Sequence, residues 1–219
     1  MADYCLLFDC DGTLVDSEPL LAEVLTETFN ALGFPFVPED YMTRYRGTAF
    51  PTILATLEAE HGTLSDPRRD AAMPAMRERL YARMDEGVPR IDGIFEAIKQ
   101  LPYPMAVVSN GPLEKIQRSM AASGLGDFFG EHLYSAYEIG HHKPDPRLYQ
   151  HAARAMGFPP ERAIVIDDAA VGVDSGLMAG MPVIHINRFP ETETTPEGAA
   201  AITHMRELPS AIERVIKRH

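Results

Sequence analysis

Two aspartates separated by one residue follow a short apolar segment near the start of the chain. Residues 4–8 predict a buried strand, and the strand period would project Asp9 and Asp11 to the same side. Gly12 then permits a sharp turn that a side chain would obstruct. Two neighbouring carboxylates repel each other, but one could be a nucleophile and the other a proton donor beside a divalent cation. On its own the pattern fits an Asp-rich turn better, so the rest of the chain must decide.

Polar residues also follow the other predicted strands of the chain. Apolar runs predict buried strands at residues 105–108, 133–135, 163–166 and 183–186. The polar residues after the first three of these strands are Ser109, Asn110 and Gly111, then Lys143, then Asp167 and Asp168. Each group alone could be a turn, a solvated charge or a helix cap. Open parallel sheets bind ligands beyond the carboxyl ends of their strands. These polar residues would share that edge, or rim, of the sheet, and together they predict a functional site.

The alternation of strands and helices from residue 88 onward indicates the fold class. Continuous apolar strands between helices predict an α/β protein with a Rossmann-like parallel sheet, covered by helices on both faces. Residues 16–87 show only helical patterns. The sequence therefore predicts a core made of residues 1–15 and 88–219, with an inserted all-helical domain at 16–87.

Charge repulsion among the acids that follow the strands would destabilise the fold unless some of them are protonated or a cation lies among them. Asp9, Asp11, Asp167 and Asp168 would bring four carboxylates together. Two like charges roughly 4 Å apart repel by about 4 kcal/mol at an effective dielectric of about 20. Lys143 supplies one positive charge, and we infer that Mg²⁺, a divalent cation that prefers oxygen ligands beside phosphate, supplies the rest.

Composition narrows the class of partner. The chain has 219 residues, 45% of them hydrophobic, and a net charge of -12, which argues against nucleic acid or an anionic membrane as the main partner. No apolar run is long enough to span a membrane, and the first residues lack the pattern of a secretory signal. Cys5 and Cys10 lie too far apart along an extended strand to form a disulfide. We therefore expect a cytoplasmic protein with free thiols, a monomer or small homo-oligomer acting on a small molecule.

The four sequence motifs together resemble the haloacid dehalogenase superfamily. They are Phe8-Asp9-Cys10-Asp11-Gly12-Thr13, Val108-Ser109-Asn110-Gly111, Lys143-Pro144-Asp145-Pro146 and Ile166-Asp167-Asp168-x-x-x-Gly172. All four are present in order, and the resemblance covers essentially the whole chain. Residues 16–87 resemble the small helical cap of that superfamily. Details of the motifs are similar to the branch of phosphatases and mutases that act on small sugar phosphates.

The resemblance implies a role for each of these residues. Asp9 would attack phosphorus and form an aspartyl-phosphate, and Asp11 would protonate the leaving alcohol and then deprotonate water. Ser109, with backbone N–H groups near Asn110 and Gly111, would bind phosphoryl oxygens, and Lys143 would stabilise the nucleophile and the transferring group. Mg²⁺ would be held by Asp9, by the backbone carbonyl of Asp11 and by Asp168. Asp167 would either bind the metal directly or contact one of its ligands. Phosphoryl transfer depends on positioning and on neutralising anionic oxygens, which these residue types provide.

Substrate specificity is expected from the helical insertion. Arg46, in the Arg44-Tyr45-Arg46-Gly47 stretch, could contact an acidic or second phosphate group of the substrate, although a solvated surface arginine fits as well. Glu18, close to the first motif, could also face the site. One position departs from the superfamily pattern, because Ala169 stands where Ser or Thr often follows the last metal-binding acid. A hydrogen bond that supports the metal ligands would then be missing or replaced.

Three functions are compatible with the sequence. We expect a Mg²⁺-dependent phosphatase acting on a small phosphorylated metabolite, a sugar phosphate or sugar-acid phosphate. A phosphomutase of the β-phosphoglucomutase type would keep Asp9 and Asp11, but it needs extra basic residues for a second phosphate, and no such pattern is clear. A catalytically silent binding module is a third reading, which the complete motif set argues against. A 2-haloacid dehalogenase is disfavoured, because that branch is not built around a second aspartate.

Overall fold

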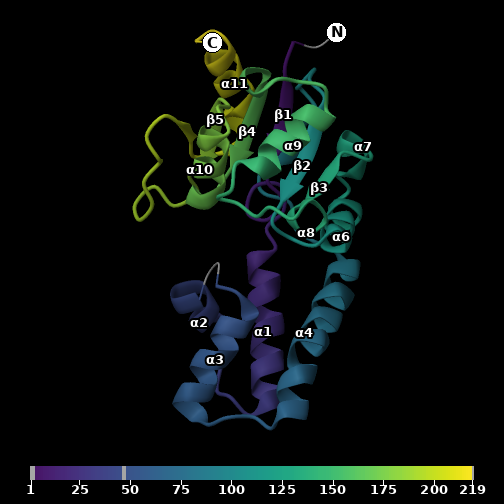
Figure 1. The fold of residues 1–219 in the computed structure, drawn as a ribbon, viewed down its shortest axis with the longest axis vertical. Helices are drawn as coiled ribbons and strands as arrows, with labels where there is room; N and C mark the ends of the chain where they lie inside the picture. Colours follow the sequence, from purple (N-terminus) through teal and green to yellow (C-terminus); the bar gives the residue numbers. More distant parts are fainter. Residues whose placement is uncertain (1–2, 46–47, 219) are drawn as a thin grey trace. The chain divides into compact units, whose positions relative to one another are not determined.

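A computed structural model describes residues 3–45 and 48–218 of the chain. The chain forms two compact units, which are described separately. One unit joins the N-terminal segment up to Asp16 with the segment from Pro89 to the C-terminus, and the other is Ser17–Val88. Figure 1 shows the first unit built around a sheet and the second built from helices.

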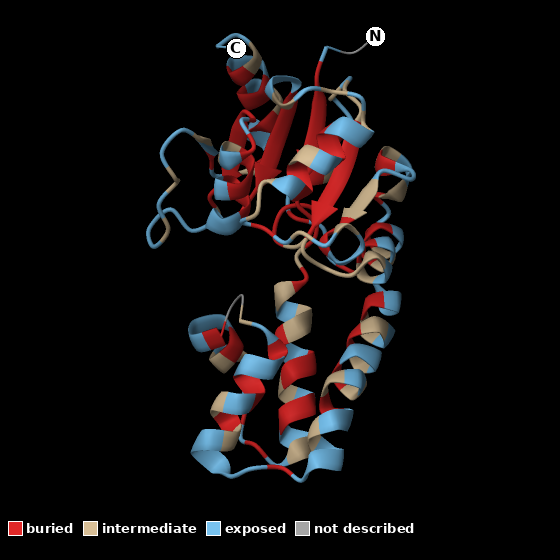
Figure 2. Cartoon of the chain, viewed as in Figure 1, coloured by how far each residue is buried: buried red, intermediate tan, exposed pale blue. Residues whose placement is uncertain are grey.

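The first unit contains a six-stranded sheet in which every pair of neighbouring strands is parallel. The strands are β1 (Cys5–Phe8), β2 (Met105–Ser109), β3 (Leu133–Ser135), β4 (Ala163–Asp167), β5 (Val183–Ile186) and β6 (Ala200–Ile202). Every residue of β1, β2, β4 and β5 is buried, as Figure 2 shows. Such runs have apolar side chains on both faces because helices cover both sides of a parallel sheet. The predicted Rossmann-like α/β core is confirmed.

The strand order is β3-β2-β1-β4-β5-β6, which makes β1 the point where the order reverses. Phe8, the last residue of β1, lies opposite Val107 in β2 and Ile166 in β4. The residues that follow β1 therefore emerge between the carboxyl ends of β2 and β4. Open α/β sheets bind ligands at such a switch point.

Helices of the first unit cover the two faces of the sheet. They are α5 (Ile94–Ile98), α6 (Leu113–Ser123), α7 (Gly126–Phe129), α8 (Ala136–Ile139), α9 (Arg147–Ala155), α10 (Ala170–Met178) and α11 (Leu208–Ile216), with short 3₁₀ turns at Pro160–Arg162 and Met205–Glu207. Leu148 and Tyr149 of α9 belong to one buried cluster with Leu7 of β1 and Val165 of β4. Phe129 of α7 makes an edge contact with Phe8, which points to the opposite face from Leu7.

The period of the strands explains which polar residues face α9. Leu7 and Val165 lie on the α9 face, and side chains two residues further along each strand point the same way. Those next positions are Asp9 and Asp167. The fold therefore directs both carboxylates toward the helix that carries Tyr149.

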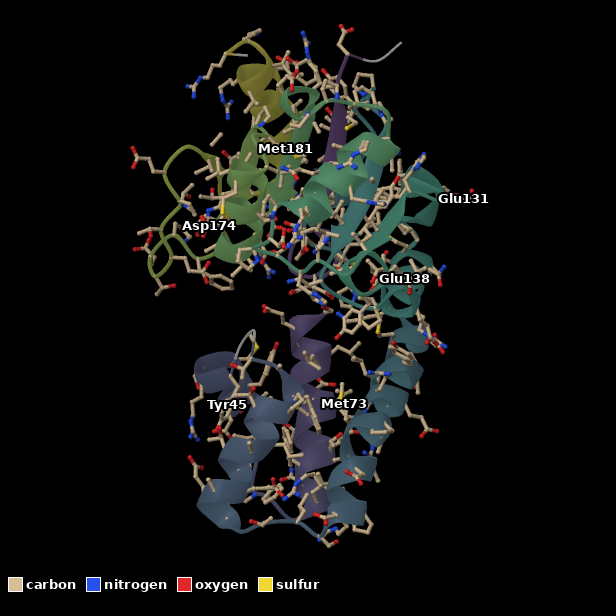
Figure 3. All side chains as sticks on the ribbon, in the orientation of Figure 1. Tyr45, Met73, Glu131, Glu138, Asp174 and Met181 are labelled. Atoms are coloured by element: carbon tan, nitrogen blue, oxygen red, sulfur yellow. The ribbon has the colours of Figure 1, made fainter. Side chains whose placement is uncertain are left out.

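The second unit is a bundle of helices with an aromatic core. It comprises α1 (Glu18–Leu32), α2 (Pro38–Asp40), a π-helical turn at Tyr41–Tyr45, α3 (Phe50–His61) and α4 (Asp66–Glu86). Phe29 stacks on Phe50 at 5.2 Å and contacts Phe36 at 4.9 Å, and Phe36 in turn stacks on Tyr45 at 5.9 Å. Tyr45 is labelled within this unit in Figure 3. These rings give the small unit a core of its own.

One strand of the sheet differs from the sequence-based expectations. Strand β6 was not expected, because Ala200–Ile202 is a short edge strand with little β-branched or aromatic content. Among the described residues, no helix has both the length and the apolar character needed to cross a membrane.

Candidate active site

The two aspartates of the first motif follow β1 in a tight turn. The N–H group of Asp9 donates to the carbonyl of Ile166 at 2.9 Å, so Asp9 still pairs with β4. Gly12 donates its N–H group to the carbonyl of Val15 at 2.8 Å and has a φ of 88°, in the left-handed region that favours glycine. The chain thus reverses directly after Asp11 and leaves both carboxylates at the carboxyl edge of the sheet.

Gly12 is also required for space. A Cβ atom built on Gly12 would lie 2.2–2.7 Å from the carboxylate atoms of Asp168. Gly172 has the same relation to the neighbouring acid, because its Cβ would lie 1.8–2.4 Å from the carboxylate atoms of Asp167. The two glycines of the motifs therefore make room for the two acids at the end of β4.

Lys143 links the carboxylates of two different motifs. Its Nζ lies 2.5 Å from Asp9 Oδ1 and 2.8 Å from Asp167 Oδ2, and its side chain is 3% exposed. Asp9 and Asp167 are also nearly buried. The predicted rim therefore brings these three residues into direct contact, across sequence separations of 134 and 24 residues.

Burial governs the protonation of this group. Removal from water raises the pKa of Asp9 to about 7, although the Lys143 ammonium opposes the shift. Burial also works against the charge on Lys143, but the carboxylates of Asp167 and Asp9 outweigh it and hold the pKa of Lys143 well above its usual value. Lys143 is therefore a permanent cation beside the candidate nucleophile.

Tyr149 is a member of the site that the sequence analysis missed. Its hydroxyl donates to Asp167 Oδ2 at 2.7 Å, and its ring lies 4.9 Å from the Lys143 ammonium. The side chain is fully buried, and burial raises the pKa of its hydroxyl well above the usual value. Asp167 also accepts the N–H group of Ala169 at 2.9 Å. Tyr149 thus fixes the Asp167–Lys143 pair through a hydrogen bond and a cation–π contact.

The second motif lies at the end of β2 and orients two of its own residues. Ser109 Oγ accepts the N–H group of Gly111 at 3.0 Å, which leaves the proton of the serine hydroxyl as a donor. The Asn110 side chain accepts the N–H group of Lys143 at 2.8 Å and donates to its carbonyl at 3.3 Å. Asn110 therefore fastens the Lys143 loop to the end of β2. Its predicted contribution to phosphate binding stays a prediction.

A second lysine, also missed from the sequence, belongs to the site. Lys115 Nζ lies 2.6 Å from Asp11 Oδ1, and the lysine side chain is 17% exposed. Burial works against its charge, but the Asp11 carboxylate outweighs that effect and raises the pKa of Lys115. Lys115 therefore adds a second protein cation to the one that Lys143 supplies.

The donor set fits a divalent cation. Among the described residues, one oxygen from each of Asp9, Asp167 and Asp168 lies within 4.8 Å of the others, close enough for the three to share a metal ion. Four carboxylates face two lysine ammonium groups, which leaves two negative charges for one divalent cation to balance. Hard oxygen ligands of this kind suit Mg²⁺.

Two residues from other parts of the chain support Asp168. Thr13 Oγ1 donates to Asp168 Oδ1 at 3.0 Å. His185 Nε2 lies 3.0 Å from the Asp168 carbonyl, which can only accept, and its Nδ1 lies 2.9 Å from Thr195 Oγ1. Ala169 offers no side-chain hydrogen bond. Thr13 and His185 instead provide hydrogen bonds that support the proposed metal ligand Asp168, in place of the one expected from Ser or Thr at position 169.

The two predicted specificity residues belong to the second unit. Glu18 is the first residue of α1. Arg46 lies outside the described residues. Their roles toward a substrate stay predictions.

Comparisons with known proteins agree with this geometry. A family model described as haloacid dehalogenase-like hydrolase matches residues 5–180. The chain is 35% identical to 6-phosphogluconate phosphatase of Escherichia coli strain K12 over 206 residues, which cover 93% of this chain and 92% of the relative. It is 30% identical to a plasmid-encoded phosphoglycolate phosphatase of Cupriavidus necator over 183 residues, covering 81% and 78% of the two chains.

A solved structure extends the similarity to three dimensions. A variant of CbbY from Rhodobacter sphaeroides, in complex with xylulose-(1,5)bisphosphate, superposes with a TM-score of 0.76 at 27% identity, covering 94% of this chain and 96% of that one. The family match and the relative at 35% identity each span most of the chain, so the predicted resemblance is confirmed. The chain is a member of the haloacid dehalogenase-like hydrolase family.

Proposed function

We propose that this chain is a Mg²⁺-dependent phosphatase that hydrolyses a small phosphorylated metabolite through an aspartyl-phosphate on Asp9. One observation carries the proposal: Lys143 joins the Asp9 and Asp167 carboxylates, and both lie in one cluster with Asp168. This arrangement gathers a nucleophile, a fixed cation and oxygen ligands for a metal at a sheet switch point. The phosphatase names of the curated relatives support the same reaction class.

In the first half-reaction, Asp9 attacks the phosphorus atom of the ester. A bond forms between a carboxylate oxygen and phosphorus, the bond from phosphorus to the ester oxygen breaks, and Asp11 gives its proton to the departing alkoxide. Ser109 donates its hydroxyl proton to a phosphoryl oxygen, and Lys143 balances the negative charge of Asp9 and of the transferring group.

In the second half-reaction, water replaces the enzyme on phosphorus. Asp11, now a carboxylate, takes a proton from the attacking water, and the bond between phosphorus and Asp9 breaks. Phosphate leaves, and both aspartates return to their starting states. Asp11 loses a proton in the first half-reaction and regains one in the second, so the cycle needs no other proton donor or acceptor.

Asp9, Asp167, Asp168 and the backbone carbonyl of Asp11 would hold Mg²⁺. When bound, Mg²⁺ supplies positive charge that offsets the carboxylates and the phosphoryl oxygens. When all four acids are ionised, Lys143 and Lys115 neutralise two of the four carboxylates, so a divalent cation would balance the other two. Thr13 and His185 hold Asp168 at the end of β4.

The proposed substrate is a sugar phosphate or a sugar-acid phosphate. 6-Phosphogluconate and phosphoglycolate, in the names of the two relatives, are small phosphate esters that carry a carboxylate. Glu18 and Arg46 are proposed to face such a substrate from Ser17–Val88, which we propose is the cap. The family's mutase activity is the alternative, and the bisphosphate in the CbbY complex keeps it open to test.

We also propose a cytoplasmic enzyme that works as a monomer or small homo-oligomer. Both cysteines are free and buried, which suits a reducing compartment. The chain carries a net charge of -12 and the proposed substrate is small, so no nucleic acid or membrane partner is proposed.

The function is tested by phosphate release from a panel of small phosphate esters, with and without Mg²⁺. The panel contains 6-phosphogluconate, phosphoglycolate, hexose and pentose phosphates, and two aryl phosphates. The proposal predicts Mg²⁺-dependent release that Asp9→Asn removes while the variant stays folded. Release that survives in Asp9→Asn would contradict the mechanism. Isomerisation of a sugar phosphate in the presence of a bisphosphate, without net release, would favour the mutase.

A further inference from the structure

Lys115 is a half-buried cation in an unfavourable place. It lies in the first turn of α6, two residues after the helix begins at Leu113. The N-terminal end of a helix repels positive charge, and the side chain is also largely removed from water, at 17% exposed. Two unfavourable conditions at one residue call for a specific partner. That partner is Asp11, 104 residues away in sequence, at 2.6 Å.

The Lys115 side chain passes close to the second motif. A Cβ atom on Gly111 would lie 3.7 Å from Lys115 Cδ and 3.4 Å from Ser109 Oγ. Both separations are ordinary van der Waals distances, so the lysine stem and the Ser109 hydroxyl both lie close to Gly111.

The carboxylate that Lys115 contacts, Asp11, has a role in the proposed reaction. Asp11 is the proposed proton donor and acceptor, its side chain is 30% exposed, and it lies two residues from the Asp9 carboxylate. Repulsion between the two carboxylates would turn Asp11 away from Asp9 unless a cation holds it. Lys143 binds Asp9 and Asp167. Lys115 is thus a cation, distinct from Lys143, that contacts Asp11 directly.

We infer that Lys115 is a positioning residue for Asp11, holding its carboxyl group in the orientation from which it serves the leaving oxygen. This inference rests on the proposed phosphatase function. It assigns Lys115 an effect only on the step that moves a proton to or from the ester oxygen or water. A lysine that merely balanced charge would affect every phosphate ester alike.

The discriminating property is the leaving group. An alkoxide leaving group needs a proton from Asp11, whereas dinitrophenolate leaves without one. We compare the alkyl ester of the panel that the wild-type enzyme hydrolyses fastest with 2,4-dinitrophenyl phosphate. The variants are Lys115→Met, Lys115→Arg, Asp11→Asn and the Lys115→Met/Asp11→Asn double variant. The control for the loss of one positive charge is Lys99→Met, at the exposed residue that directly follows α5.

The expected result is a selective loss. Removing a general acid lowers rates by about 100-fold or more, so Asp11→Asn should do this for formation of the phosphoenzyme from the alkyl ester. Lys115→Met should lower the same single-turnover rate by about tenfold, with a much smaller effect on dinitrophenyl phosphate. Lys115→Arg should recover most of the loss. Lys115→Met should add nothing in the Asp11→Asn background, because residues that act as one unit are not additive.

The outcomes separate the two claims. Equal losses on both esters, or a full additional loss in the Asp11→Asn background, would overturn the role of Lys115 and leave the phosphatase intact. An effect of Lys99→Met equal to that of Lys115→Met would also overturn it, since net charge would then explain both. Absence of Mg²⁺-dependent turnover of either ester by the wild-type chain would overturn the proposed function, and the inference with it.

Discussion

The Tyr149 hydroxyl donates a hydrogen bond of 2.7 Å to Asp167 Oδ2, the same oxygen that Lys143 Nζ contacts at 2.8 Å. Both residues that approach this oxygen are nearly or fully buried. Helix α9 and the loop before it therefore hold one acid of the site from two sides. Because Lys143 and Tyr149 contact the same buried oxygen, the position of the Lys143 ammonium depends on the Tyr149 hydroxyl.

Tyr149→Phe should destabilise the fold and lower turnover. The ring would still face the Lys143 ammonium, but Asp167 would lose one of its donors, which costs about 1–3 kcal/mol for a buried charged acceptor. Urea denaturation of the wild type and the variant measures this loss. Tyr137→Phe, at a side chain that is 58% exposed, is the control and should leave stability unchanged. Equal stability of Tyr149→Phe and wild type would show that the hydrogen bond contributes nothing.

Gly12→Ala should weaken metal binding beyond what its backbone strain explains. The added Cβ would collide with the Asp168 carboxylate, at 2.2 Å from one oxygen, and would displace a proposed metal ligand. Gly140→Ala is the matched control, because Gly140 has a similar φ of 80° with nothing within 4 Å of its Cβ position. Both variants should lose about 1 kcal/mol of stability from backbone strain. Only Gly12→Ala should bind Mn²⁺ at least about tenfold more weakly, a loss of 1.4 kcal/mol. Equal Mn²⁺ affinity in the two variants would contradict the account.

The two cysteines should resist thiol reagents in the native protein. Burial raises the pKa of Cys5 to about 12 and holds the pKa of Cys10 well above its usual value, so neither forms the reactive thiolate at neutral pH. Ellman's reagent should label no thiol in the folded protein and both thiols in guanidinium. Val171→Cys, at a position that is 49% exposed, should react at once and shows that the reagent works. Rapid labelling of one native thiol would contradict this prediction.

The helical unit should show a pH-dependent stability that depends on Glu58. Arg69 donates to both oxygens of this carboxylate at 2.8–3.2 Å, and the Leu64 N–H group donates at 2.9 Å. The Arg69 hydrogen bonds hold the pKa of Glu58 below its usual value of 4.5. A depressed pKa means that the stabilisation is complete above 4.5 and disappears as the pH falls through the lowered value.

Glu58→Gln should therefore lower the melting temperature at neutral pH. The difference from wild type should shrink to nothing in acid, where Glu58 of the wild type is itself protonated. Thermal unfolding of wild type and variant, from neutral pH down to acid below the lowered pKa of Glu58, measures both the difference and its disappearance. Glu60→Gln, a charge change of the same size at the exposed end of the same helix, should show a smaller difference. A Glu58→Gln difference that is independent of pH would mean that the ionised carboxylate is not what stabilises the unit.

The residues that the sequence could predict are those tied to strand ends. Asp9, Ser109 and Asp167 each end or follow an apolar run, and the parallel sheet then brings them to one edge. Lys143 was found through its motif. The parallel sheet followed from the alternation of elements, but its strand order was not predicted, and β6 carried no signal because Ala200–Ile202 is short and lies at the edge.

The residues that were missed depend on tertiary contacts without a spacing pattern. Tyr149 and His185 reach the site from α9 and β5, and nothing in their neighbours distinguishes them from ordinary core residues. Lys115 left one usable sign, a lysine in the first turn of a helix, where positive charge is unfavourable. Thr13 stood inside the first motif, but only the structure pairs it with Asp168.

The most direct test of the mechanism is the site of covalent phosphate. A folded, Mg²⁺-loaded sample is mixed with its best phosphate ester, quenched in acid within one turnover and reduced with borohydride, which converts an acyl phosphate on aspartate to homoserine. Peptide mass spectrometry then locates the homoserine. The account predicts it at position 9 in the wild type and at no position in Asp9→Asn. Turnover of the ester with homoserine at any other residue, or with none at all, would contradict Asp9 as the nucleophile.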